Sequence, residues 1–175
     1  MTGLFNLGSI KHLSLPDTWV SLPVEQDARS GETSYEYRLR SDEDVKLLLF
    51  YRGRLLPEPI GQDFLKALQS DPHDLAGEEY FSIECVIRNM SEDSFFQRYS
   101  VKTELLNGHK VIAVEGLWKE SDLKTLAVFV DGNGKGTLVD ELHFYAPSAK
   151  YDEHLAEFKK ILASIKFVQL ERQKS

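Results

Sequence analysis

The dipeptide Asn107-Gly108 stands between two stretches of alternating apolar and polar residues, 98–106 and 109–118. A two-residue hairpin turn of type I′ needs positive φ at both central positions, which Asn and Gly adopt more readily than other residues. The pattern therefore predicts a tight β-hairpin whose register is set by its turn. Three residue pairs are expected to face each other across it: Leu106 and His109, Thr103 and Ile112, and Val101 and Val114.

Two further stretches of strand-like sequence follow, at 123–130 and 137–145, each after a polar turn. Consecutive strands joined by short turns pair in an antiparallel manner. We therefore expect a four-stranded antiparallel meander over residues 98–145.

An amphipathic helix is predicted directly after this meander. Pro147 has no backbone N–H and cannot continue a central strand, and Ser148 is suited to cap a helix that begins after it. Large apolar residues then recur with helical spacing: Tyr151, Leu155, Phe158, Leu162 and Ile165. Since such a stripe must be buried, we expect the helix to lie on the sheet and residues 164–168 to return as a short strand or an extended tail.

The N-terminal part of the chain predicts a strand at 10–15 and a second hairpin at 35–51 with its turn at 42–44. The register expected for this hairpin joins Leu39 with Leu47, Tyr37 with Leu49 and Tyr35 with Tyr51. Its second strand also carries Leu48 and Phe50 on the opposite side, and a strand that is apolar on both sides is usually covered on both sides. The hairpin therefore indicates a layered structure.

Helical periodicity returns between the two hairpins. Ile60, Phe64 and Leu68 are spaced by four residues, which is typical of one helix face. Residues 74–90 fit either a helix or a strand, and the longer four-residue periodicity favours a helix.

Composition narrows the class of protein. A chain of 175 residues suits one domain, which we expect to span residues 1–175 with a frayed C-terminal tail from about residue 170. The net charge of −7 argues against nucleic-acid binding, and no run reaches the roughly 18 apolar residues of a membrane span, so no membrane insertion is expected. With one cysteine and no signal-peptide pattern at the N-terminus, the predicted location is cytoplasmic.

Arginines alternate on the hairpin predicted at 35–51 and continue just after its second strand, where they form the clearest local basic cluster: Arg38, Arg40, Arg52 and Arg54. Guanidinium groups in this arrangement suit an acidic partner surface or a phosphate. The alternative is a solvated strand edge whose charge discourages aggregation.

A second candidate site lies on the last predicted strand, where Glu141, His143 and Tyr145 share one side. Glu115 joins them if the strand order follows the chain. Such a polar cluster suits a metal or acid–base chemistry. The alternative is a polar sheet face, or a contact with a covering helix.

Two other features carry no site. Residues 131–142 imitate a calcium loop, but Lys135 takes the fifth ligand position and Leu142 stands where a bidentate Glu is required, so a plain hairpin loop is expected. Cys85 has weak electrostatic support for a reactive thiolate, and we expect a small core residue. No metal or cofactor is predicted.

Three segments resemble the PsbP-like fold family, which also includes the Ran-binding Mog-one import factor and bacterial DcrB-like proteins. They are "LSLPDTW" at 13–19, "LNGHKVIAVEGLW" at 106–118 and "FYAPSAKYDEHLAEFKKILASIKF" at 144–167. The resemblance implies an α+β fold in which helices flank an antiparallel sheet as an α/β/α sandwich. It also implies mostly non-catalytic work, such as binding a protein partner, assisting assembly or chaperoning.

We therefore expect a cytoplasmic, non-catalytic binding or assembly module that acts through contacts with a protein partner. The alternative is an enzyme or a small-ligand carrier that uses the polar cluster around Glu141 and His143. The sequence predicts neither the partner nor the oligomeric state.

Overall fold

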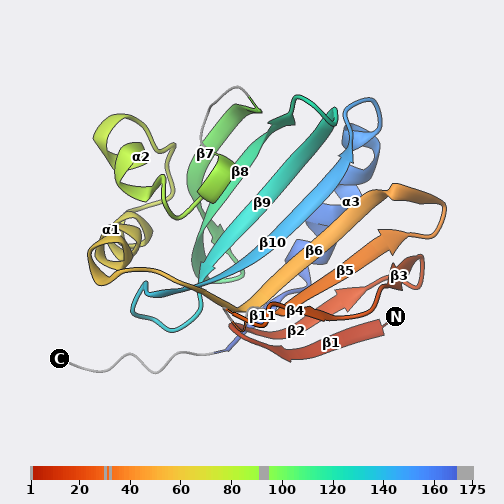
Figure 1. The fold of residues 1–175 in the computed structure, drawn as a ribbon, viewed down its shortest axis with the longest axis horizontal. Coiled ribbons are helices and arrows are strands. Elements are labelled where there is room, and N and C mark those ends of the chain that lie inside the picture. Colours follow the sequence, from red (N-terminus) through yellow and green to blue (C-terminus); the bar gives the residue numbers. More distant parts are fainter. Residues whose placement is uncertain (1, 30, 32, 91–94, 169–175) are drawn as a thin grey trace.

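A computed structural model of the chain describes residues 2–29, 31, 33–90 and 95–168 (Figure 1). The expected frayed tail lies outside these residues. The strands are β1 (Thr2–Leu7), β2 (Ile10–Leu15), β3 (Trp19–Ser21), β4 (Glu25–Gln26), β5 (Thr33–Leu39), β6 (Asp42–Leu55), β7 (Phe96–Leu106), β8 (His109–Trp118), β9 (Leu123–Asp131), β10 (Leu138–Pro147) and β11 (Lys166–Phe167). The helices are α1 (Glu58–Gln69), α2 (Gly77–Ile83), the short 3₁₀ helix η1 (Arg88–Met90) and α3 (Tyr151–Ala163).

The main sheet is antiparallel and has the strand order β3-β5-β6-β10-β9-β8-β7, with β4 paired to β5. A second, smaller sheet has the order β1-β2-β11. Helices α1 and α2 lie on one face of the main sheet, and α3 lies on the other (Figure 1). The predicted α+β architecture, an antiparallel sheet flanked by helices, is confirmed.

The hairpin β7–β8 has the predicted register, with Leu106 opposite His109, Thr103 opposite Ile112 and Val101 opposite Val114. Asn107 and Gly108 have φ values of 49° and 84°, as a type I′ turn requires. The predicted meander continues through β9 and β10, and β10 also pairs with β6.

The register predicted for the hairpin β5–β6 is wrong by two residues. Tyr37 pairs with Leu47 and Tyr35 with Leu49, because the chain turns at residues 40–41 and β6 carries a bulge near its start. A shift of two residues leaves each side chain on its predicted face, since side chains alternate with a period of two. Tyr37, Leu47 and Leu49 are accordingly buried together.

Helix α3 and the smaller sheet build the core on one face of the main sheet. Phe158 stacks on Phe144 of β10 with ring centroids 4.7 Å apart, and both side chains are fully buried. Of the predicted apolar stripe, Tyr151, Phe158 and Leu162 are buried, Leu155 is half-buried, and Ile165 is buried just after the helix ends. The predicted cap is wrong. The residue before the helix is Lys150, which makes no side-chain cap, whereas the Ser148 hydroxyl donates to Asp122 Oδ2 in the neighbouring turn.

Helices α1, α2 and η1 build a second core against β7, β8 and β9 on the opposite face. The ambiguous segment 74–90 is mainly helical, as favoured. Cys85 was expected in the core but is exposed, because Ile83 and Val86 occupy the inward positions on either side of it. None of the helices in the described residues is long and apolar enough to cross a membrane.

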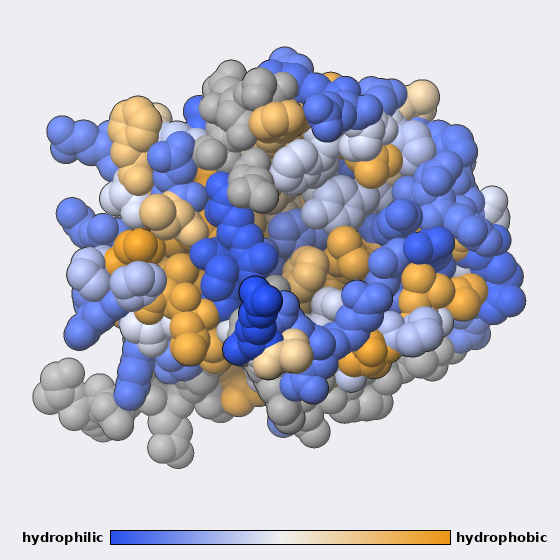
Figure 2. Space-filling view, in the orientation of Figure 1, coloured by the Kyte–Doolittle hydropathy of each residue, from blue (hydrophilic) through white to orange (hydrophobic). Residues whose placement is uncertain are grey.

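On the face of the main sheet that carries α1 and α2, neither of these helices lies over β5, β6 and β10, and the Arg88 side chain of η1 reaches across to Glu141 and the Phe50 ring (Figure 1). We call this surface the open face, and its half-buried or buried side chains are Glu36, Arg38, Lys46, Leu48, Phe50, His143 and Tyr145. Apolar residues gather in the hollow at the middle of this view and are bordered by hydrophilic ones (Figure 2). The expectation that β6 is covered on both sides therefore holds for Leu47 and Leu49 but not for Leu48 and Phe50.

Candidate functional site

A buried carboxylate, Glu141 of β10, is the centre of the predicted polar cluster. Its side chain is 1% exposed, and its Oε1 atom lies 3.3 Å from Arg54 Nε and 3.0 Å from Arg88 Nε. Its Oε2 atom accepts a hydrogen bond of 2.9 Å from His143 Nε2. Three cationic or polar donors thus surround one carboxylate, which is the arrangement that a buried charge needs.

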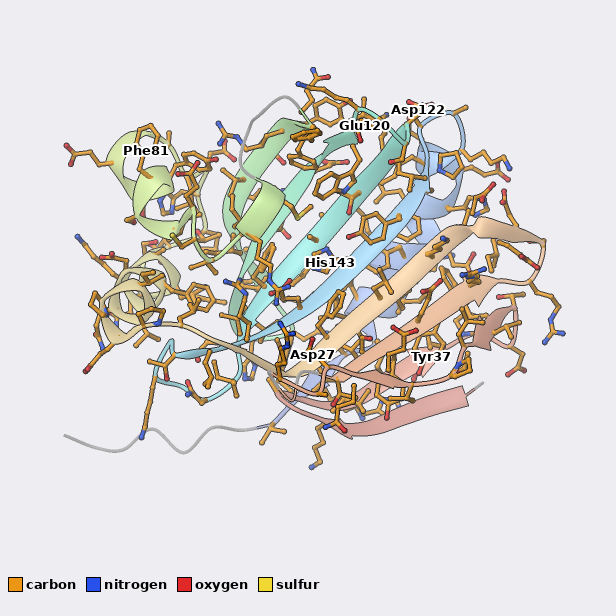
Figure 3. All side chains as sticks on the ribbon, in the orientation of Figure 1. Asp27, Tyr37, Phe81, Glu120, Asp122 and His143 are labelled. Carbon is orange, nitrogen blue, oxygen red and sulfur yellow. The ribbon has the colours of Figure 1, made fainter. Side chains whose placement is uncertain are left out.

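His143 is oriented by a chain of hydrogen bonds along β10. Since an ionised carboxylate only accepts, Nε2 of His143 carries the proton that is donated to Glu141. The Tyr145 hydroxyl is hydrogen-bonded to His143 Nδ1 at 3.0 Å. The histidine that the sequence placed beside Glu141 and Tyr145 therefore contacts both, on the side of the sheet that carries α1 and α2 (Figure 3).

Aromatic rings enclose the imidazole of His143. Phe50 of β6 and Phe129 of β9 contact it edge-on, with centroids 5.5 and 5.7 Å away, and the Tyr145 ring stacks on it at 5.8 Å. Only 7% of His143 is exposed. The ring is thus held in one position with little access for solvent.

Electrostatics keep this cluster ionised at its centre and neutral at its end. Burial alone would raise the pKa of Glu141, but the hydrogen bond from His143 and the positive charges of Arg88 and Arg54 outweigh it, so the pKa lies below its ordinary value. Burial and the neighbouring Glu141 charge raise the pKa of Tyr145. The phenol therefore remains a proton donor at neutral pH.

Arg54 extends the cluster to the segment that follows α2. Its Nη1 atom donates to the carbonyl oxygen of Cys85 at 2.7 Å, and Nη2 donates to that of Val86. Glu141, through Arg54 and Arg88, thus attaches residues 85–88 to the sheet. The partner Arg88 has no signal in the sequence pattern, because it comes from η1, far from β10 along the chain.

Glu115 does not join the cluster. It pairs with Leu126 of β9, and its Oε1 atom accepts a 2.9 Å hydrogen bond from the Tyr151 hydroxyl at the start of α3. Glu115 therefore lies on the opposite face of the sheet from His143. The strand order follows the chain here as assumed, but Glu115 and His143 lie in adjacent rows of the sheet, and adjacent rows point to opposite faces.

The four arginines of the predicted basic cluster are divided among different environments. Arg38 lies on the open face and pairs with Glu36 at 2.7 Å, Arg40 is exposed in the turn, and Arg54 belongs to the Glu141 cluster. The side chain of Arg52 lies outside the described residues. Arg38 and Arg54 therefore contribute to the surroundings of the open face from two of its sides.

The loop that imitates a calcium site uses its first carboxylate internally. Asp131 Oδ1 accepts backbone N–H groups of Asn133, Gly134 and Gly136 at 3.1–3.2 Å. Among the described residues, no group of three His, Cys, Asp or Glu side chains is positioned to hold a metal ion.

A second histidine has neighbours that resemble a catalytic triad. His73 lies 3.3 Å from Ser70 Oγ through Nδ1 and 2.8 Å from Glu79 Oε2 through Nε2. However, the shortest contact of Nδ1, at 2.7 Å, is with the carbonyl oxygen of Asp71, which can only accept. Because Nδ1 must donate there, it cannot accept a proton from Ser70, and the group holds the α1–α2 connection together.

Comparison with known proteins supports the fold. No protein-family model and no curated protein sequence matches the chain. Among solved structures, the chain is similar to the cyanobacterial PsbP (CyanoP) of Synechocystis sp. PCC 6803, with a TM-score of 0.53 and 13% sequence identity over 95% of this chain and 92% of that one. The chain therefore has a PsbP-like fold.

Proposed function

We propose that this protein is a non-catalytic binding or assembly module, one folding unit over residues 1–175, whose open face binds an acidic segment of a partner protein. The observation that carries the proposal is that α1 and α2 leave β5, β6 and β10 uncovered, so that apolar and basic side chains lie half-buried together there. A cytoplasmic location is part of the proposal, because a chain with one cysteine depends on no internal disulfide.

The charge of the open face differs in sign from that of the whole chain. Four basic side chains lie on it or at its border, Arg38, Lys46, Arg54 and Arg88, and three acidic ones, Glu36, Glu141 and Glu43, which lies 4.0 Å from Arg38, so the net charge is +1. The chain as a whole carries −7. A local positive surface on an acidic protein attracts an acidic partner.

The apolar part of the open face gives the partner an area to bury. Leu48 and Phe50 of β6 and Tyr145 of β10 share this face and are only half-buried, with Leu48 opposite His143 and Phe50 opposite Glu141. Aromatic residues and arginines are enriched in protein interfaces, where the ring supplies area and the guanidinium supplies directional hydrogen bonds. The open face combines both.

The internal hydrogen bonding of the Glu141 cluster favours a non-catalytic role. Both carboxylate oxygens of Glu141 and both ring nitrogens of His143 already have protein partners. A general base needs an accessible lone pair within reach of a substrate proton. The cluster instead holds the strands and residues 85–88 rigidly in place beside the open face.

A defined peptide tests the binding mode. We expect a peptide of alternating Glu and Leu residues to bind the protein in fluorescence anisotropy, more tightly at low salt, and its counterpart with Lys in place of Glu to bind far more weakly. Lys46→Glu should weaken binding of the acidic peptide by about tenfold. Lys66→Glu is the matched control, because Lys66 is exposed on α1 and makes the same charge change away from the open face.

Equal binding of the two peptides, or equal effects of the two substitutions, would refute the proposal. A partner captured from source cells supports the proposal only if the Lys46→Glu variant fails to bind it and the Lys66→Glu variant still binds it. Turnover of a small molecule by the purified protein that His143→Gln abolishes would support the enzymatic alternative instead.

A further inference from the structure

A cleft of about 260 Å³ opens on the other face of the main sheet, between α3 and the hairpin β7–β8. Small side chains create it: Ser100 of β7 and Ala113 of β8 point to this face and do not reach the flank of the helix. The volume corresponds to about nine water molecules. It therefore suits a ligand of about ten non-hydrogen atoms.

One wall of the cleft is apolar. Leu126 of β9 and Leu155 and Leu162 of α3 line it, beside the core that the helix forms with the sheet. Leu126 and Leu155 are only half-buried, so an aliphatic group that enters the cleft removes their remaining apolar surface from water.

A carboxylate without a direct ion-pair partner among the described residues lies in the same cleft, and the positive charge of Lys102 acts on it from the neighbouring strand. Glu115 is half-buried, and the hydroxyl of Tyr151 donates to its Oε1 atom at 2.9 Å. Within the described residues, its Oε2 atom has no hydrogen bond and Glu115 has no ion-pair partner. By contrast, the neighbouring Glu104 forms an ion pair with Lys102. Glu115 is thus positioned to accept a hydrogen bond from a cationic group of a ligand.

A free ammonium group borders the cleft from the helix. Lys159 lies on α3 one turn after Leu155, lines the cleft and is exposed. No ion pair involves it within the described part of the chain. The cleft therefore presents Glu115 and the ion pair Lys102–Glu104 from the sheet and Lys159 from the helix, with leucines alongside.

We infer that this cleft binds a small zwitterion with an aliphatic side chain, such as a neutral aliphatic amino acid. Glu115 accepts from its ammonium group, Lys159 donates to its carboxylate, and Leu126, Leu155 and Leu162 contact its side chain. This site is independent of the proposed function, because the cleft and the open face lie on opposite sides of the main sheet.

Three ligands of similar shape distinguish the contributions of the ammonium group and the carboxylate to binding. L-leucine carries both, leucinamide keeps only the ammonium group, and 4-methylpentanoate keeps only the carboxylate. We expect leucine to shift the backbone amide resonances of Ala113 and Leu126 in nitrogen-15 NMR titrations, and each of the other probes to bind about tenfold more weakly. Equal binding of all three, or no shift up to the solubility limit of leucine, would overturn the inference.

Two substitutions with matched controls assign the contacts. Glu115→Gln keeps an oxygen for the Tyr151 hydroxyl but loses the charge. It should lower the affinity for leucine by about tenfold and leave the affinity for 4-methylpentanoate unchanged. Glu120→Gln, at the exposed turn after β8, should change neither (Figure 3). Lys159→Gln should lower the affinity for leucine and leave the affinity for leucinamide unchanged, whereas Lys160→Gln should change neither affinity. Leucine affinity that survives both cleft substitutions would show that the charges do not recognise the ligand.

Discussion

The side-chain amide of Asn107 lies 2.8 Å from the carbonyl oxygen of Ile165, 58 residues further along the chain. The same Nδ2 atom lies 3.3 Å from the carbonyl oxygen of Leu162 and 3.1 Å from that of Ala163. The last carbonyl groups of a helix have no partner within it. The turn residue of the hairpin β7–β8 thus adds hydrogen bonds to carbonyl groups at the end of α3 and just after it, of which that of Leu162 also accepts the Ile165 N–H.

We expect Asn107→Gly to destabilise the protein by about 1–3 kcal/mol, because the freed carbonyl groups at the end of α3 lose their donor. Glycine keeps the positive φ that the turn needs, so the substitution isolates the contact with the helix. Chemical denaturation followed by circular dichroism measures the change. A stability equal to that of the unmodified protein would show that water replaces Asn107 without loss.

Glu141→Gln should destabilise the protein by about 3–5 kcal/mol, because it leaves the cations of Arg54 and Arg88 without their anion in a buried site. In the unmodified protein, folding lowers the pKa of Glu141. The charge of Glu141 therefore contributes stability above the pKa of an unfolded Glu, and this stability is lost as the pH falls through the folded pKa. The variant should therefore lose less stability than the unmodified protein on acidification. Unfolding curves at several pH values test this, with Glu120→Gln as the exposed control, and parallel pH profiles would contradict it.

Asp140, the residue before Glu141, should behave in the opposite way. It is completely buried beside Gly8, Gly53 and Gly132, with Oδ2 accepting the Ser9 N–H at 2.7 Å, and burial raises its pKa more than this hydrogen bond lowers it. The folded protein then binds more protons than the unfolded chain, so stability falls as the pH rises from the unfolded pKa to the folded pKa.

Asp140→Asn removes that ionisation and keeps an oxygen for the Ser9 N–H. We expect it to cost less than about 1 kcal/mol at neutral pH and to abolish the corresponding decline in stability as the pH rises. The same unfolding curves measure it. A loss as large as that of Glu141→Gln would mean that the Asp140 charge itself is needed.

The two tryptophans report on opposite faces of the main sheet. Trp19 is buried in the core formed with α3, and Trp118 packs on the core formed with α1 and α2. If residues 1–175 form one folding unit, both cores unfold together. In Trp19→Phe and Trp118→Phe variants, the fluorescence of the remaining tryptophan should therefore give the same midpoint as circular dichroism of that variant. Two separate midpoints would indicate two units.

Local patterns were sufficient for most of the elements. The turn Asn107-Gly108 specifies its own register because positive φ is required at two consecutive residues, and the helix α3 follows from five apolar residues on one face. The register of the hairpin β5–β6 was less well determined by the sequence. None of its turn residues requires positive φ at a defined position, so the predicted register was shifted by two residues. Burial of Tyr37 and Leu47 was still predicted correctly, since such a shift preserves the faces.

The candidate site was only partly predictable. Glu141, His143 and Tyr145 are separated by two residues on one strand, so the sequence alone brought them together. Which groups complete the cluster depends on strands and helices that meet only in the folded chain, and these brought Arg88 to it and placed Glu115 behind the sheet.

The sequence by itself determined the periodicities, the tight turn and therefore the α+β class, because backbone preference and the alternation of side chains act over a few residues. The tertiary structure decided which faces of the sheet are covered. Packing of α1 and α2 over β7, β8 and β9 left β5, β6 and β10 open, and the small residues of β7 and β8 left a cleft beside α3. Both outcomes depend on how distant elements fill space against one another, which no local pattern specifies.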